Sequence, residues 1–110
     1  MNKGTLRDLI VAMSKAFNAN DVSSDFVADI QFHVSGEEPG DYYVHIEDGR
    51  CAFHEGVSKS PKATINTPSE VWIAIARGEL DGRKAFFERK FTLEGDLMLL
   101  LQLRNMFKIA

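Results

Sequence analysis

Three histidines are the side chains best suited to chemistry in this 110-residue chain. His33, His45 and His54 fall on the polar positions of segments in which apolar and polar residues alternate. In one register of the strands on either side of residues 35–41, His33 lies opposite His45, and a three-histidine zinc site is conceivable. The alternative is three hydrated side chains on the wet face of a sheet. Since no carboxylate or cysteine completes a sharp spacing, we expect no metal site.

Cys51 is the one cysteine, so an internal disulfide is excluded and a reducing cytosolic compartment fits best. Alternation turns Cys51 inward beside Ile46, which predicts a buried structural thiol rather than a nucleophile. The sequence contains no Gly-x-Ser-x-Gly elbow, P-loop or Gly-x-Gly-x-x-Gly. We therefore expect no catalytic residues, no cofactor and no enzyme, with an enzyme that uses the histidine face as the alternative.

The basic residues Arg83, Lys84, Arg89 and Lys90 form a cluster in an otherwise acidic chain. The net charge is −3 and the isoelectric point about 5.5, so binding to nucleic acid is not expected. The cluster indicates either a solvated surface or a contact for the phosphate of an acyl-CoA or for an anionic membrane.

The elements that must position these residues follow from hydrophobic periodicity. A helix is predicted over residues 5–18, where one stripe holds Leu6, Leu9, Ile10, Met13 and Phe17. From residue 28 to 67 the period changes to two, and the inward positions are Ile30, Phe32, Val34, Tyr42, Val44 and Ile46. This pattern predicts half-buried antiparallel strands, with residues 63–66 as a fourth and shorter one.

The Asp48-Gly49 pair is the strongest turn signal in the chain. A two-residue turn there pairs the residues on either side of it, Glu47 with Arg50. The same register places Val44 opposite Phe53 and Ile46 opposite Cys51, and the apolar faces of the two strands then coincide.

In the second half of the chain, Thr67-Pro68-Ser69-Glu70 predicts a helix that begins at Pro68 behind a Thr67 cap. This helix ends at Gly78, and its inward residues are Val71, Trp72, Ile75 and Ala76. A short helix near residues 83–89 presents Phe86 and Phe87, and residues 91–93 form a fifth strand.

A last helix over residues 97–109 carries more apolar residues than a terminal helix of a small domain needs. Its broad apolar face holds Leu99, Leu100, Leu103, Met106 and Phe107. This surplus has to be buried against the sheet, against a partner chain or against a bound apolar molecule.

The order of these elements resembles the sterol carrier protein family. The resemblance begins with Asp48-Gly49 between two strands, Ala63-Thr64-Ile65, and a helix from Ser69 to Gly78. It continues with Gly82, with Ala85-Phe86, and with Phe91-Thr92-Leu93-Glu94-Gly95-Asp96 before the apolar terminal helix, and it spans residues 6–107. Relatives usually carry glycine before the lysine that opens the last strand, whereas this chain has Arg89 before Lys90. The shape of the turn at this position is therefore left open.

The resemblance implies one α+β domain over residues 1–110. Its sheet would have five mostly antiparallel strands, with helices covering one face and a hydrophobic cavity between them. The implied function is non-enzymatic binding, with transfer as a further option, of a fatty acid, fatty acyl-CoA or sterol-like lipid. Alternation and helical spacing pick out the inward residues, and the resemblance suggests that they line the cavity: Phe32, Val34, Val44, Ile46, Phe53, Ile65, Trp72, Ile75, Phe86, Leu100, Leu103 and Phe107.

The alternative is an accessory domain that forms homodimers or binds a partner through the apolar helix at residues 97–109. The expected partner is otherwise a hydrophobic small molecule, with transient membrane contact and a homodimer as further options. The N-terminus lacks an apolar signal-peptide run, and the chain ends in Lys108-Ile109-Ala110 rather than a Ser-Lys-Leu-like address. A cytoplasmic location is therefore expected.

Overall fold

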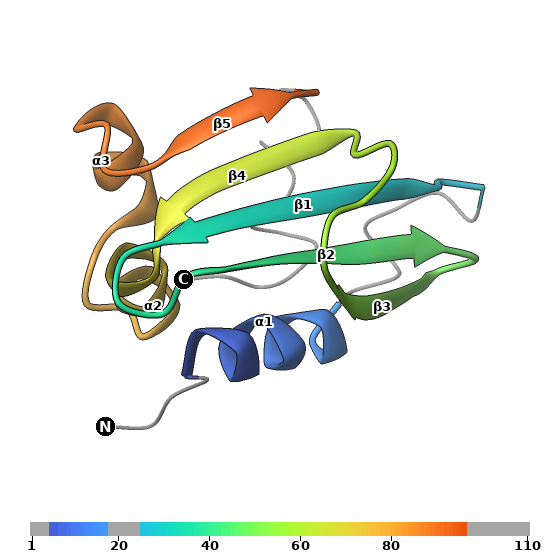
Figure 1. The fold of residues 1–110 in the computed structure, drawn as a ribbon, viewed down its shortest axis with the longest axis horizontal. Helices are drawn as coiled ribbons and strands as arrows, with labels where there is room; N and C mark the ends of the chain where they lie inside the picture. Colours follow the sequence, from blue (N-terminus) through green and yellow to red (C-terminus); the bar gives the residue numbers. More distant parts are fainter. Residues whose placement is uncertain (1–4, 18–24, 97–110) are drawn as a thin grey trace.

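The computed structural model of the protein describes residues 5–17 and 25–96, and these form an α+β fold around one five-stranded sheet (Figure 1). The strand order is β3-β2-β1-β4-β5. None of the helices in the described ranges is long and apolar enough to cross a membrane. In chain order the elements are α1 (Thr5–Lys15), β1 (Ala28–Ser35), β2 (Gly40–Glu47), β3 (Arg50–Glu55), β4 (Ala63–Pro68), α2 (Ser69–Ala76), α3 (Gly82–Phe87) and β5 (Thr92–Gly95).

The hairpin between β2 and β3 has the predicted register. Glu47 pairs with Arg50, and the strands continue with Ile46 opposite Cys51 and Val44 opposite Phe53. Asp48 and Gly49 have φ angles of 55° and 71°. A two-residue turn of this kind requires a positive φ at both central positions, which aspartate and glycine tolerate.

The pairing of β1 with β2 differs from the prediction. His33 lies opposite Asp41, four residues earlier in β2 than expected, and His45 pairs with Asp29. The chain reverses at once after β1 because Gly36 adopts a φ of 88°, so that Val34 already pairs with Gly40. The shift is even, so each strand still turns the same side chains inward.

The strand β4 is parallel to β1, so the prediction of antiparallel strands was wrong for this pair. Phe32 lies opposite Ile65 in the parallel register, and β5 pairs with β4 in an antiparallel one. A parallel neighbour requires a crossover, and the connection at residues 56–62 supplies it (Figure 1).

Gln31 fastens this crossover to the outer face of the sheet, opposite α1 and α2. Its side chain is fully buried, although alternation places it on the polar face. The amide nitrogen donates to the carbonyls of Tyr42 (2.9 Å) and Gly56 (3.1 Å), and the amide oxygen accepts from the Ser58 N–H at 2.7 Å. The side chain thereby satisfies backbone groups that belong to both β2 and the crossover.

The inner face of the sheet packs against α1 and α2. Leu6, Ile10 and Met13 are buried as the periodicity predicts, in one cluster with the apolar residues of the central strands. The helix ends at Lys15, earlier than predicted, and Phe17 packs half-buried against the cluster beyond its end.

The second helix begins at Ser69, so the predicted cap at Thr67 is wrong. Pro68 still has extended backbone angles (φ −64°, ψ 145°), and the Thr67 hydroxyl donates to the Pro68 carbonyl. Trp72 and Ile75 are buried as expected, whereas Ala76 in the last turn is exposed because it lies about 100° around the helix from Ile75.

Glu70 joins this helix to the turn between β1 and β2. Its carboxylate accepts a hydrogen bond from the Glu37 N–H at 3.0 Å and another from the Ser69 hydroxyl at 2.7 Å. These hydrogen bonds favour the ionised form, so they hold the pKa of Glu70 below its usual range.

The turn that follows α3 retains the backbone shape that glycine favours. Arg89 has a φ of 60°, in the left-handed region that only glycine adopts without strain. The backbone at Arg89 therefore has the positive φ that suits glycine, although the residue at this position is an arginine.

We expect Arg89→Gly to raise the free energy of unfolding by up to about 1 kcal/mol. It removes left-handed strain of roughly 1–2 kcal/mol, and the greater freedom of glycine in the unfolded chain cancels part of this gain. Arg89→Val should have the opposite sign, because a β-branched side chain resists positive φ. Urea denaturation measures both variants, with Lys90→Gly as the neighbouring control. Equal stability of the glycine and valine variants would contradict the assignment of strain to Arg89.

Candidate functional site

The predicted site residues on the strands and on α2 meet at the boundary between the sheet and its helices. Phe53 is half-buried at the rim, whereas Phe86 is 41% exposed. Three further positions, Leu100, Leu103 and Phe107, lie outside the described residues, as does the whole predicted helix at residues 97–109. The buried members of the set are Phe32, Val34, Val44, Ile46, Ile65, Trp72 and Ile75.

These buried residues belong to one apolar cluster, so the structure brings them together on one face of the sheet. We call these seven buried residues the apolar floor. The side chains that would complete a cavity above it belong to the predicted terminal helix, which lies outside the described ranges. The role of the floor residues as a cavity lining therefore stays a prediction, and so does the accessory-domain alternative, which depends on the same helix.

A row of aromatic rings leads from the surface to this floor. Ring centroids are 6.0 Å apart for Phe87 and Phe86, 5.8 Å for Phe86 and Phe91, 6.0 Å for Phe91 and Trp72, and 5.5 Å for Trp72 and Phe32. Exposure falls along the row from 81% and 41% at the first two rings to 8%, 6% and 0% at the others. Helical spacing and alternation pointed to three of these rings, Phe32, Trp72 and Phe86, but carried no signal for the order of the row, because the rings come from separate elements.

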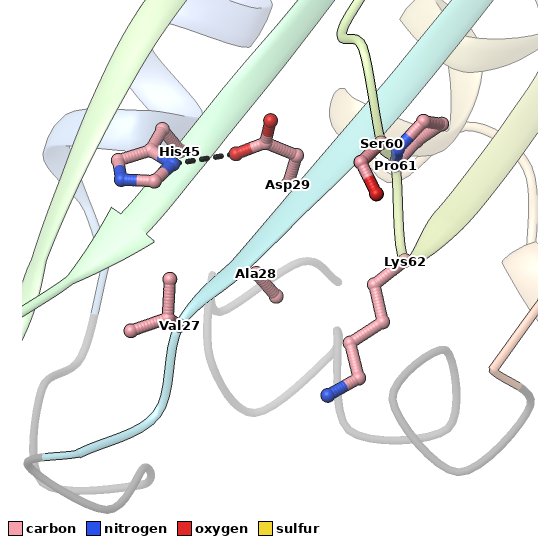
Figure 2. A pocket seen from close by; sticks show the side chains of 7 residues that line it. All are labelled: Val27, Ala28, Asp29, His45, Ser60, Pro61 and Lys62. Atoms are coloured by element: carbon pink, nitrogen blue, oxygen red, sulfur yellow. Dashed lines mark hydrogen bonds and ion pairs between the residues drawn. The ribbon is translucent and has the colours of Figure 1, made fainter.

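A shallow pocket of about 350 Å³ lies at a different place, where β1 begins and the crossover reaches β4 (Figure 2). It is partly polar and is not the apolar cavity that the sequence predicts. No sequence pattern indicated it, because the segments that meet there are distant in the chain. Its lining consists of Val27, Ala28, Asp29, His45, Ser60, Pro61 and Lys62.

His45 is held between two carboxylates at the edge of this pocket. Its Nδ1 lies 2.5 Å from an oxygen of Asp29, as drawn in Figure 2, and its Nε2 lies 2.7 Å from an oxygen of Glu47. These hydrogen bonds raise the pKa of His45, with Asp29 as the larger cause. Each ring nitrogen therefore already has a carboxylate partner, so neither is free to bind a metal or to accept a proton from a substrate.

The nearby Ser58 hydroxyl does not complete a nucleophile with this histidine. It donates to the second carboxylate oxygen of Asp29 at 2.5 Å, whereas the imidazole nitrogens face Asp29 and Glu47. In a Ser-His-Asp triad the hydroxyl bonds to the imidazole instead. The cluster therefore fastens the crossover and does not activate the serine.

The three histidines do not come together. His33 bonds to Asp41 at 2.6 Å, and the ring of His54 stacks on Tyr43 at 4.9 Å, as their pairing in the hairpin predicts. Within residues 5–17 and 25–96 there is no group of three or more His, Cys, Asp or Glu side chains that could hold a metal ion. The three-histidine arrangement fails because His33 lies opposite Asp41 rather than His45.

Cys51 lies opposite Ile46, as predicted, and is half-buried. Burial raises the pKa of its thiol to about 12. The thiolate is the nucleophilic form, and at neutral pH it is therefore disfavoured. The environment suits a structural thiol.

We expect the stability contributed by His45 to fall as the pH rises. The folded pKa lies above the unfolded value of about 6.5, so the contribution is complete below about pH 6.5 and is lost as the pH passes through the folded value. The melting temperature of the wild type should exceed that of His45→Gln at about pH 6, and the gap should narrow by about pH 9. His54→Gln is the control, and a gap that stays constant for His45→Gln would contradict the prediction.

Comparisons with known proteins match nearly the whole length of the chain. The model of the SCP-2 sterol transfer family matches residues 11–108. No curated protein matches the chain. The solved structure of palmitated SCP2L2 from Aedes aegypti has a similar fold, with a TM-score of 0.76, 22% identity, and coverage of 97% of this chain and 95% of that one.

Two further solved structures share the fold. Sterol carrier protein-2 from Aedes aegypti, in complex with a sixteen-carbon fatty acid (palmitate), has a TM-score of 0.68 at 12% identity, with 96% of each chain covered. A stereoselective inverting sec-alkylsulfatase from Pseudomonas sp. has a TM-score of 0.69 at 14% identity, with 86% of this chain but only 15% of that chain covered. The predicted α+β architecture is confirmed, with a mixed sheet.

Proposed function

The chain belongs to the SCP-2 sterol transfer family, and on that premise we propose that it binds a single-chain lipid between the inner face of the sheet and the helices. The ligand class is a fatty acid or a fatty acyl-CoA in preference to a sterol-like lipid. The protein holds this ligand without changing it chemically. We further propose that the protein transfers this ligand between membranes.

The family match carries this proposal, because residues 11–108 include all five strands and all but the last residue of the predicted terminal helix. Two proteins that share the fold are described with palmitate, which supports a straight acyl chain over a rigid ring system. The apolar floor is a further support, since sites for small hydrophobic molecules are lined mainly by apolar side chains of this kind.

The charges of the protein support a binding mode in which only the tail is buried. Among the described residues, the buried polar side chains are all uncharged: Ser14, Gln31, Ser58, Thr67 and Ser69. A carboxylate taken into this interior would lack an ionic partner there, and its desolvation would be strongly unfavourable. The head group of the ligand therefore stays at the surface while the acyl chain enters.

Binding rather than catalysis also fits the state of the reactive side chains. Both nitrogens of His45 face carboxylates, and the thiol of Cys51 has a pKa of about 12. The sec-alkylsulfatase that shares the fold is far longer, and this chain covers 15% of it. Its activity is therefore no guide to the function of a chain that corresponds to one small part of it.

Trp72 provides a direct test, because it is the only tryptophan and lies against Phe32 in the apolar floor. A fatty acid brominated in mid-chain should quench the fluorescence of Trp72, and the same acid without bromine should not. Mass spectrometry of the protein purified under native conditions, followed by organic extraction, should recover a lipid. Absence of quenching together with absence of extractable lipid would refute the proposal.

A further inference from the structure

The short helix α3 places two phenylalanines at the surface, at one end of the sheet beside β5 (Figure 1). Phe87 is 81% exposed, which is the highest value among the exposed large apolar side chains of the described residues. The neighbouring Phe86 is partly exposed and contacts both Phe87 and Phe91. Two adjoining aromatic rings at the surface form an apolar patch, and such a patch marks a candidate interaction site.

The segment 82–90, which carries these two rings and follows the helix cap Asp81, is more basic than the rest of the chain. Residues 82–90 hold four of the 13 lysines and arginines but only one of the 16 acidic residues, Glu88. The rest of the chain holds nine basic and 15 acidic residues. A positive segment on a negative protein orients the molecule towards an anionic surface.

Most of this positive charge is not neutralised within the protein. Glu88 lies 3.6 Å from the ammonium group of Lys90. In the part of the chain that the structure describes, no ion pair involves Arg83, Lys84 or Arg89, and all three residues are exposed. Their cationic groups are available to a partner.

We propose that α3 is a docking element for an anionic membrane surface. Phe87 enters the boundary between head groups and acyl chains, and the basic residues 83, 84, 89 and 90 contact the lipid phosphates. Long basic side chains reach the head groups while an aromatic ring lies deeper, which is the arrangement of interfacial anchors. Each basic residue close to an anionic membrane contributes attraction that falls off within a Debye length.

The aromatic row gives this docking a direction. A membrane in contact with Phe87 lies at the outer end of the rings that lead through Phe91 and Trp72 to the apolar floor. An acyl chain that leaves the membrane there could stay in apolar contact until it reaches the floor. Entry of an acyl chain by this route rests on the proposed function, whereas docking to the membrane does not.

Co-sedimentation with vesicles tests the docking on the complete, ligand-free chain. We expect binding to vesicles that contain phosphatidylglycerol, weak binding to pure phosphatidylcholine, and release at a salt concentration of about 0.5 M. Phe87→Ser should weaken binding about tenfold. Replacing both Arg83 and Lys84 by glutamine should weaken it about 25-fold, at roughly fivefold for each charge.

The crossover offers a matched control at another site. Val57 is 61% exposed and Lys59 is exposed beside it, so Val57→Ser combined with Lys59→Gln removes one apolar and one basic surface group away from α3. This control should bind vesicles as the wild type does. Equal losses in the control and in the α3 variants would mean a general charge effect and would overturn the proposal, as would α3 variants that bind normally.

Two further readouts distinguish membrane docking from the binding of a soluble ligand. Quenching of Trp72 by a brominated fatty acid without vesicles should be unchanged in the Arg83→Gln/Lys84→Gln variant, so a failure of lipid binding is distinguishable from a failure of docking. If coenzyme A binds to the basic residues and displaces the protein from vesicles stoichiometrically, these residues form a phosphate site for an acyl-CoA and the membrane proposal is wrong.

Discussion

Palmitate should bind to this protein about 200-fold more tightly than laurate, which has four fewer methylenes. Burial of each methylene contributes about 0.8 kcal/mol, so four of them contribute about 3.2 kcal/mol, and each 1.4 kcal/mol is tenfold in affinity. The gain requires that the whole tail leaves water. In the proposed binding mode, the tail is buried against the apolar floor of the sheet, to which the row of rings from Phe87 leads.

Displacement of a fluorescent fatty acid, or calorimetry below the concentration at which the acids form micelles, measures this dependence. Two derivatives of palmitate act as matched controls. The methyl ester should bind about as tightly as the acid, because the head group stays at the surface. A hydroxyl at the far end of the tail should weaken binding at least tenfold, because it is buried without a partner. Equal affinity for laurate and palmitate would place the tail outside the protein.

The sequence predicts a structural feature well when neighbouring residues determine it, and less well when the feature depends on segments that are distant in the chain. The hairpin of β2 and β3 was predicted residue by residue, because two turn residues and two alternating strands determine its register. The buried stripe of α1 was predicted for the same reason, since Leu6, Ile10 and Met13 recur with the helical period.

Features decided between distant segments were predicted less well. The loop between β1 and β2 could close in more than one way. With Gly36 at a positive φ, the chain reverses early, and each β1 residue pairs with a β2 residue four positions earlier than expected. The parallel pairing of β4 with β1 leaves no mark in local alternation, because parallel and antiparallel strands share a period of two. It depends on the route of the crossover, which is a tertiary feature.

The candidate site shows the same division. Alternation identified the floor residues Phe32, Val44 and Ile65 as inward, and the structure buries them. The exposure of Phe86 on α3 was not predictable from its spacing, because a six-residue helix carries too little periodicity to show which side faces the core. The partly polar pocket was missed because residues from β1, β2 and the crossover meet there only in the folded chain.

Gln31→Ala should lower the free energy of unfolding by about 3 kcal/mol. The wild-type side chain is fully buried, and its amide group donates to the carbonyls of Tyr42 and Gly56 and accepts from the Ser58 N–H. Alanine leaves these backbone groups without their partner, and each unsatisfied buried group costs about 1–3 kcal/mol. Not every group adds its full cost, since water can enter part of the space.

Urea denaturation of Gln31→Ala and of two companions shows whether the amide or merely the position matters. Thr64 lies directly opposite Gln31 on β4 and is half-buried on the same face, so Thr64→Ala is the matched truncation and should cost less than about 1 kcal/mol. Gln31→Leu keeps the volume but loses the hydrogen bonds, and should be nearly as unstable as the alanine variant. If the leucine variant is as stable as the wild type, packing and not hydrogen bonding holds the crossover to the sheet. The parallel strand β4 would then be kept in place by its apolar contacts alone.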